Sequence, residues 1–127
     1  MVEDYSKILM DRFLNPRHAG EMKSPSGVGK VGNVVCGDII QVFIKVEKGK
    51  ITKASFLTYG CAAAIAVADA LCEIVKGKTL NQAKKIKMED IIKELSGIPY
   101  LKRHCSELAI GALKKAIDNY ENKSSKN

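Results

Sequence analysis

The sequence predicts one α+β domain, in which a small antiparallel sheet of about three strands is covered on one face by helices. Two neighbouring stretches, 39–47 and 51–59, alternate apolar and polar residues as half-buried strands do, and helical patterns follow them. The chain has 127 residues, of which 46% are hydrophobic, enough to bury a core. We assign residues 1–121 to this domain and residues 122–127 to a polar C-terminal tail.

The first predicted helix covers residues 5–14, with Asp4 as its cap and Asn15-Pro16 at its end. Its apolar face is expected to hold Ile8, Leu9 and Phe13. A glycine-containing stretch over 20–32 then reads as a flexible loop, and 31–35 is a candidate third strand. Gly27-Val28-Gly29 resembles part of a dinucleotide fingerprint, but no strand precedes it and no helix follows, so we discount a nucleotide site.

The two clearest strands form a predicted hairpin. In the first strand the apolar residues recur at every second position, and residues 47–50 supply a turn before the second strand. The residues expected on one face are Ile40, Val42, Ile44 and Val46.

Four helical patterns follow the hairpin. The first is alanine-rich and covers 61–76, with Gly77 just past its end. Thr79 and Gln82 fit a capping box that opens a short helix, and 88–95 predicts another. The last helix is expected to begin near Leu101, and its apolar stripe comprises Leu101, Cys105, Leu108, Ala109, Ala112, Leu113, Ala116, Ile117 and Tyr120.

Charge and composition exclude several classes of protein. The chain carries 21 basic and 14 acidic residues, a net charge of +7, but the lysines are scattered and the aromatic residues are few, without the basic–aromatic interleaving of single-strand binders. We therefore expect no nucleic acid and favour a solvated lysine-rich surface, which would suit an acidic protein partner. No apolar run reaches the roughly 18 residues of a membrane helix, and the N-terminus does not resemble a secretory signal. The expected location is cytoplasmic, with no membrane partner.

Four cysteines are the most informative residues, because thiols in the cytoplasm serve packing, metal binding or chemistry. None forms a Cys-x-x-Cys pair, which argues against a zinc ribbon and a thioredoxin-like site. Cys36 lies in a tight connection between predicted strands, and Cys61 and Cys105 lie at predicted helix starts. The helix dipole lowers the pKa of a thiol there, and the thiolate is the form that binds metal or attacks sulfur.

Cys72 differs from the other three. It shares a helix face with Cys61 but lies eleven residues later, about 16 Å along the axis, too far to share a metal with it. We predict that Cys72 packs in the core. The remaining thiols, with Asp38 and His104 nearby, suit Zn²⁺ or an iron–sulfur cluster. The spacing of the cysteines alone is also compatible with two alternatives. The three thiols could be unrelated buried residues, or they could carry out thiol chemistry without a metal.

These residues also carry a family resemblance over nearly the whole chain. The chain resembles iron–sulfur cluster assembly scaffolds of the IscU type, also found as the N-terminal domain of NifU. The matching pieces, in chain order, are Tyr5-Ser6 with Asn15-Pro16-Arg17, Cys36-Gly37-Asp38, Thr58-Tyr59-Gly60-Cys61 with Ala64-Ile65-Ala66, Val75-Lys76-Gly77-Lys78, and Lys102-Arg103-His104-Cys105-Ser106.

The resemblance implies a scaffold rather than a conventional enzyme. Such a scaffold takes sulfur from a cysteine desulfurase and iron from a donor, assembles a labile [2Fe–2S] cluster and passes it to apo-acceptor proteins. The implied ligands are Cys36, Cys61 and Cys105 with Asp38 and His104, and either Asp38 or His104 is the fourth. The resemblance makes Cys105 the receiver of persulfide sulfur, suggests a supporting charge at Lys102, and allows Zn²⁺ in the apo site.

Two features refine the resemblance. Family members that use a dedicated Hsp70-type chaperone carry Leu-Pro-Pro-Val-Lys, whereas Ile98-Pro99-Tyr100-Leu101-Lys102 stands here, which counts against chaperone docking. His104 favours the IscU and NifU side over the zinc-bound SufU branch, which lacks this histidine. The alternative function is a zinc-bound persulfide acceptor that transfers sulfur without building a cluster, and a nucleic-acid-binding module is a third hypothesis.

Overall fold

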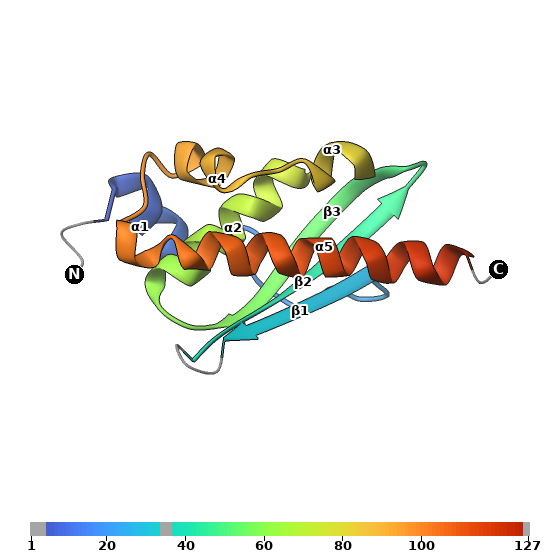
Figure 1. Cartoon of the computed structure of the whole chain (residues 1–127), viewed down its shortest axis with the longest axis horizontal. Helices are drawn as coiled ribbons and strands as arrows, with labels where there is room; N and C mark the ends of the chain where they lie inside the picture. Colours follow the sequence, from blue (N-terminus) through green and yellow to red (C-terminus); the bar gives the residue numbers. More distant parts are fainter. Residues whose placement is uncertain (1–4, 34–36, 126–127) are drawn as a thin grey trace.

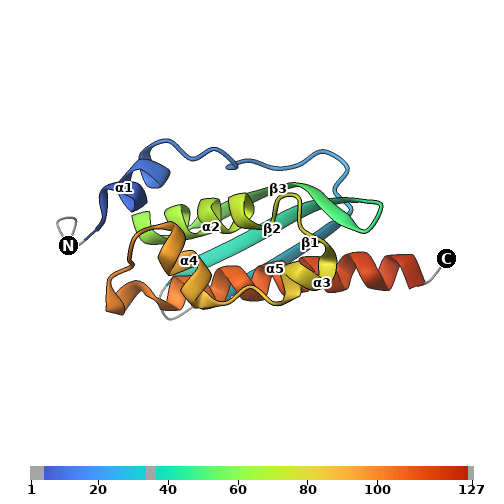
Figure 2. The same cartoon turned by 90° about the horizontal axis from the view of Figure 1, so that it is seen from above.

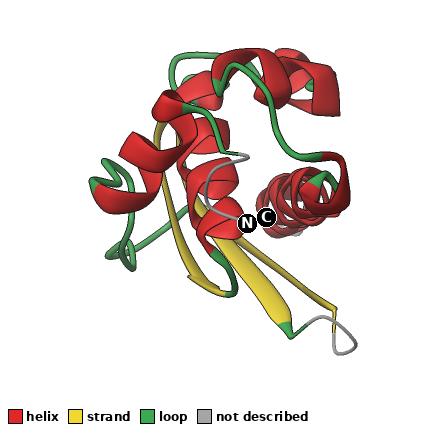
Figure 3. Ribbon diagram, turned by 90° about the vertical axis from the view of Figure 1, so that its left-hand side faces the viewer, coloured by secondary structure: helices red, strands yellow, loops and turns green. Residues whose placement is uncertain are grey.

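The predicted α+β architecture is confirmed. In this computed structural model, residues 5–33 and 37–125 are described, and they form a three-stranded antiparallel sheet in the order β1-β2-β3 with helices packed on one face (Figures 1 and 3). None of the described helices is long and apolar enough to cross a membrane. The elements in chain order are α1 (Lys7–Leu14), β1 (Gly27–Asn33), β2 (Asp38–Glu47), β3 (Lys50–Tyr59), α2 (Ala62–Val75), α3 (Leu80–Lys84), α4 (Met88–Glu94), the 3₁₀ helix η2 (Tyr100–Lys102) and α5 (His104–Ser125).

The predicted hairpin is present, and β2 and β3 pair antiparallel. Its turn places Lys48 and Gly49 at φ angles of 54° and 76°, the paired positive values that match the twist of two-residue hairpin turns. Ile40, Val42 and Ile44 are fully buried under the helices, as their spacing predicts. A register shift between Lys45 and Val46 interrupts the alternation at the end of β2, and Val46 is only partly buried.

The glycine-containing stretch is a strand over much of its length, so the expectation of a flexible loop is wrong from Gly27 onward. The glycines let α5 lie against the backbone of β1. A Cβ atom at Gly27 would lie 2.2 Å from the carbonyl oxygen of Ala116, and one at Gly29 would lie 2.1 Å from that of Ala112. Close helix–strand packing therefore explains these glycines. The third strand was expected at 31–35, and its Val34 and Val35 lie outside the described residues.

The helices after the hairpin begin and end close to the predicted positions. Cys61 is the N-cap of α2, and Gly77 follows its end with a φ of 89°. The capping box of Thr79 and Gln82 is present at the start of α3. The last helix begins at His104 rather than near Leu101, which lies in η2 and is 82% exposed, so Leu101 does not belong to the apolar stripe.

The final helix continues through residue 125. Residues 122–125 of the predicted polar tail are therefore helical, and the division of the chain at residue 121 stays a prediction.

Helix α1 differs from its prediction in two respects. Its N-cap is Ser6, whose hydroxyl accepts from the N–H of Leu9, and Asp4 lies outside the described residues. Ile8 is 44% exposed, so it does not share the buried face with Leu9. The second buried residue of this helix is Arg12.

A buried carboxylate holds α1 and the connection after it in place. Asp69 of α2 is fully buried, and its Oδ2 lies 2.7 Å from Nη1 of Arg12. Its Oδ1 accepts from the backbone N–H groups of Arg17 at 2.8 Å and His18 at 2.7 Å. Both oxygens of this buried carboxylate thus have partners, as burial of a charge requires.

The connection from α1 to β1 runs the length of the domain (Figure 2). It covers part of the outer edge of β3, where the N–H of Gly20 donates to the carbonyl of Phe56 and the N–H of Phe56 donates to that of His18. Asp69 fixes the start of this cover through the N–H groups of Arg17 and His18.

Candidate metal centre

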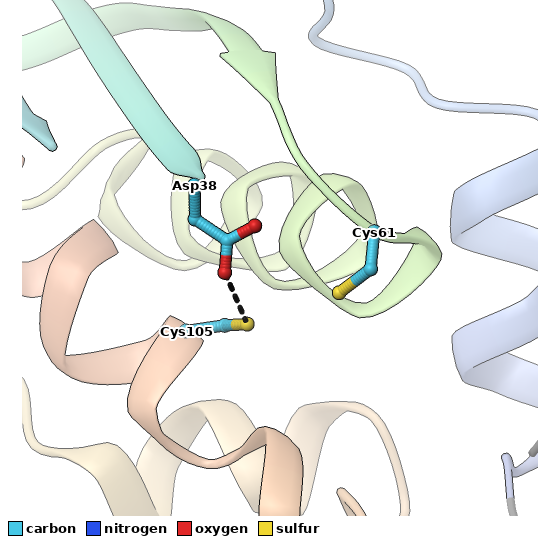
Figure 4. Close-up of side chains that lie close together, drawn as sticks. All are labelled: Asp38, Cys61 and Cys105. Atoms are coloured by element: carbon cyan, nitrogen blue, oxygen red, sulfur yellow. Dashed lines mark hydrogen bonds between the residues drawn. The ribbon is translucent and has the colours of Figure 1, made fainter. Parts of the chain in front are cut away.

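Three potential metal ligands from three distant segments meet at one end of the sheet. Asp38 is the first residue of β2, Cys61 caps α2, and Cys105 lies in the first turn of α5 (Figure 4). One ligand atom from each lies within 4.8 Å of the other two. Two sulfur ligands of one tetrahedral zinc lie about 3.5–4 Å apart, so small side-chain movements would bring all three atoms onto one metal.

Gly60 shapes the space beside Asp38. A Cβ atom at this position would lie 2.5 Å from Oδ1 of Asp38 and 3.1 Å from Cβ of Ala64. Its absence leaves room for the aspartate carboxylate next to the start of α2. We infer that this glycine sets the direction of the Asp38 carboxylate.

His104 lies against the same carboxylate. Its Nε2 atom is 3.2 Å from Oδ2 of Asp38 and 3.8 Å from Sγ of Cys105. The His104 side chain is 34% exposed, whereas that of Asp38 is 7% exposed. Asp38 thus faces the two thiols from inside, and His104 borders them from the solvent side.

The pKa values of the two described thiols of the site shift in opposite directions, and the Cys105 thiol also donates to Oδ2 of Asp38 at 3.9 Å (Figure 4). The neighbouring Cys105 side chain lowers the pKa of Cys61 from its ordinary 9.0 to about 5, helped by the N–H groups of Ala64 and Ala63 and by the charge of Lys102. The pKa of Cys105 is raised in turn by its hydrogen bond to Cys61, by burial and by the charges of Cys61 and Asp38. The site therefore favours the thiolate at Cys61, and the expectation of a lowered pKa at Cys105, from its place at a helix start, is wrong because burial and the neighbouring negative charges outweigh the helix dipole.

The two thiols differ in solvent exposure as well as in the direction of their pKa shifts. Cys61 is partly exposed, whereas Cys105 has no exposed surface. Lys102, in η2, has a raised pKa because its ammonium faces the Cys61 thiolate. A positive charge therefore stands at the open side of the site, where it favours the ionised thiol.

The other two cysteines of the chain do not belong to the described group of three ligands. Cys36 lies outside the described residues, so its role as a ligand stays a prediction. Cys72 is fully buried in the core, and burial raises the pKa of its thiol, as expected for a packing residue. It is not part of the three-ligand group. The position of Gly60 against Asp38 is the site feature that sequence reasoning missed, and its only signal is a glycine directly before Cys61.

The family comparison covers nearly the whole chain. The family model described as NifU-like N terminal domain matches residues 4–127. The chain is 45% identical over 122 residues to the iron-sulfur cluster assembly scaffold protein IscU 1 of Archaeoglobus fulgidus, covering 96% of this chain and 80% of that protein. It is 44% identical over 127 residues to the IscU scaffold protein of Buchnera aphidicola subsp. Schizaphis graminum, covering 97% and 98%.

Solved structures agree on the fold. The N-terminal part of a nitrogen-fixing NifU-like protein from Brucella abortus superposes with a TM-score of 0.77 at 22% identity, covering 96% of this chain and 98% of that one. A scaffold protein of the SUF system from Fervidobacterium islandicum superposes with a TM-score of 0.71, also at 22% identity, covering 89% and 96%. By the extent of the family match and the identity to its IscU relatives, this chain belongs to the NifU-like N-terminal domain family.

Proposed function

We propose that this protein is a scaffold on which a labile [2Fe–2S] cluster is assembled from iron and desulfurase-derived sulfur, then transferred to apo-acceptor proteins. The convergence of Asp38, Cys61 and Cys105 within 4.8 Å is the observation that carries this proposal. The relatives in Archaeoglobus fulgidus and Buchnera aphidicola, which are named iron-sulfur cluster assembly scaffold proteins, support the same function. The proposed partners are a cysteine desulfurase, an iron donor and apo-acceptors, in the cytoplasm, where thiols stay reduced.

A mixed ligand set suits a scaffold that must release its product. We propose Cys36, Cys61 and Cys105 as thiolate ligands and a harder ligand, from Asp38 or His104, as the fourth. Hydrogen bonds, charge and exposure tune such clusters. An imidazole in place of a thiolate removes one negative charge, and a carboxylate is a harder donor that suits iron–sulfur chemistry less than a thiolate does. The partial exposure of Cys61 and His104 gives an acceptor protein access to two of these groups.

Sulfur delivery is proposed to end on Cys105. In this step a thiolate attacks the outer sulfur of the desulfurase persulfide, the donor S–S bond breaks, and the donor cysteine leaves as a thiolate. Because Cys105 is fully buried and holds its proton, this role requires local opening at the start of α5 and loss of that proton. Lys102 stands next to this turn and is proposed to stabilise the thiolate or persulfide.

The test of the scaffold proposal is anaerobic reconstitution with a cysteine desulfurase, cysteine and ferrous iron. We expect an absorbing cluster that moves to an apo-ferredoxin. The variants Cys36→Ala, Cys61→Ala and Cys105→Ala should lose the chromophore, whereas Cys72→Ala, the matched control, should keep it because that thiol is remote in the core. A chromophore that survives Cys61→Ala and Cys105→Ala would refute the proposed ligand set.

A zinc-bound persulfide acceptor is the second candidate, favoured by the lowered pKa of Cys61, whose causes include the N–H groups at the start of α2 and the charge of Lys102. This function predicts tightly held zinc after purification and faster desulfurase turnover with no chromophore. Mass spectrometry of alkylated peptides after reaction with the desulfurase would locate the transferred sulfur. Sulfur found on Cys61 but not on Cys105 would overturn the acceptor assignment.

A further inference from the structure

A lysine-rich groove lies between α3, the start of α4 and the middle of α5. Two adjoining hollows of about 400 and 660 Å³ share Lys85, Ile86 and Asp90 in their walls. We call their combined surface the basic groove. Its cationic residues come from α3, α4, α5 and the connections before and after α3, and they are Lys78, Lys84, Lys85, Lys87, Lys93 and Lys114.

The acidic side chains of the basic groove already have partners. Asp90 accepts from the backbone N–H of Lys87 at 2.9 Å and so caps α4, and Glu94 lies 3.4 Å from the Arg12 guanidinium. Lys84 alone of the groove lysines is paired among the described residues, with Glu121 at 3.0 Å. The other five groove lysines have no ion-pair partner among the described residues, and the six lysines outnumber the two carboxylates of the hollows, so the net charge of the groove is positive.

The basic groove also offers apolar surface. Ile86 is 7% exposed and Ile74 is partly buried, and both line the hollows beneath the lysines. Aromatic side chains, on which nucleic-acid bases stack, do not line either hollow. The isoleucine floor suits an apolar side chain of a peptide, a group that the phosphate backbone of a nucleic acid does not offer.

The basic groove is remote from the metal centre. Cys61 begins α2 and Ile74 lies near its end, a separation of about 20 Å along the helix. Along α5, Lys114 lies about 14 Å beyond Cys105. Figure 1 shows α3 well away from the start of α5. A partner seated on the basic groove would leave the metal centre uncovered.

We propose that the basic groove docks an acidic segment of a partner protein, with carboxylates on the lysines and an apolar side chain on Ile74 and Ile86. The proposal rests on this surface alone and holds whichever chemistry the metal centre performs. Its consequence is bipartite recognition, in which the partner is held at one surface while the metal site stays accessible to a second protein.

The test uses the full chain and a fluorescein-labelled dodecapeptide that repeats Glu-Glu-Leu, with binding followed by fluorescence anisotropy at low salt. The groove variant is Lys85→Glu with Lys87→Glu. The matched control is Lys30→Glu with Lys53→Glu, two exposed lysines on strands β1 and β3. Both double variants lower the net charge from +7 by four units.

We expect the groove variant to bind the peptide about tenfold more weakly and the control to bind within about twofold of the parent chain. Amide resonances of residues 84–87 and 114 should shift on binding, and those of Cys61 and Cys105 should not. An equal loss of peptide affinity in both double variants would show that binding depends only on net charge, and it would overturn the proposal. It would also be overturned by absence of binding, by equal binding of a Gln-Gln-Leu peptide, or by tighter binding of a 20-base-pair DNA duplex.

Both double variants should retain the metal binding of the parent chain, because neither touches the centre. A failure of cluster assembly in every variant and in the parent would contradict the scaffold proposal while leaving peptide binding unaffected. The two proposals are therefore tested separately.

Discussion

The substitution Gly60→Ala tests whether the direction of the Asp38 carboxylate controls metal binding. A Cβ atom at residue 60 would lie 2.5 Å from Oδ1 of Asp38, and real Cβ contacts are essentially never under 3.0 Å. The carboxylate must therefore move by at least about 0.5 Å, beyond the roughly 0.2 Å tolerance of metal–ligand distances. The backbone at Gly60 does not have a positive φ, so the substitution adds no strain of that kind.

We expect Gly60→Ala to weaken Zn²⁺ binding about tenfold, the lower end of the effect of losing a group that orients a ligand. This corresponds to about 1.4 kcal/mol of binding free energy. The affinity for Zn²⁺ is measured by competition with a chromogenic chelator. The same competition is then measured for the iron in the reconstituted protein, by the loss of its chromophore. Circular dichroism should show an unchanged fold, because the displaced atoms belong to one side chain.

The control for Gly60→Ala is Gly111→Ala in α5, where a Cβ atom would lie 3.5 Å from Cγ2 of Val31, an ordinary contact. This control should bind Zn²⁺ like the parent. The double variant of Gly60→Ala with Asp38→Ala should bind no more weakly than Asp38→Ala alone, since both changes remove the same interaction. Full additivity of the two losses, or unchanged affinity in Gly60→Ala, would refute the reasoning.

Three further predictions concern the thiolate, the buried ion pair and the glycine contacts. The rate of Cys61 alkylation by iodoacetamide in the apo protein should rise through about pH 5, because its lowered pKa leaves the thiolate above that pH and the thiol below it. Asp69→Ala should lower the free energy of unfolding in urea by about 3–5 kcal/mol, since it removes the nearest carboxylate of a buried arginine and the acceptor of two backbone N–H groups. Gly29→Ala should lower it by about 1–3 kcal/mol, because its Cβ would displace α5 from β1.

Each of these three has its own control. Lys102→Ala should move the alkylation midpoint of Cys61 to higher pH, and a midpoint that stays near pH 9 in the parent would contradict the thiolate assignment. Asp11→Ala, which removes an exposed pairing with Arg17, should change stability by no more than about 0.5 kcal/mol. Gly29→Ala with full stability would show that the backbone contact between α5 and β1 is looser than described.

Local sequence patterns were sufficient to predict most of the fold. Alternation in β2 and the capping box of Thr79 and Gln82 depend on neighbouring residues, so they are visible without tertiary information. The first glycines of β1 were misread because their reason lies in α5, more than eighty residues later. Arg12 and Asp69 look like surface charges in the sequence, and only the tertiary fold reveals that they pair in the interior.

The candidate site was predictable to a similar degree. The settings of Cys61 and Cys105 at helix starts, together with the family resemblance, identified two of the three residues that converge. Asp38 was a candidate from its place beside Cys36, and the resemblance strengthened that assignment. The unequal protonation of the two thiols could not be predicted, because it depends on their mutual distance and on burial of one of them. The place of Gly60 against Asp38 required the same three-dimensional information.

The tether at Asp69 has a consequence for self-association. An uncovered strand edge offers unpaired N–H and C=O groups on which another chain can add a strand. Here the backbone of residues 18–20 occupies the edge of β3 at Phe56, and the N–H bonds to Asp69 hold the start of that segment. Loss of this single carboxylate would therefore open a template for intermolecular pairing as well as weaken the fold. Asp69→Ala protein should form β-rich aggregates at concentrations where Gly29→Ala, with its edge still covered, remains dispersed in light scattering.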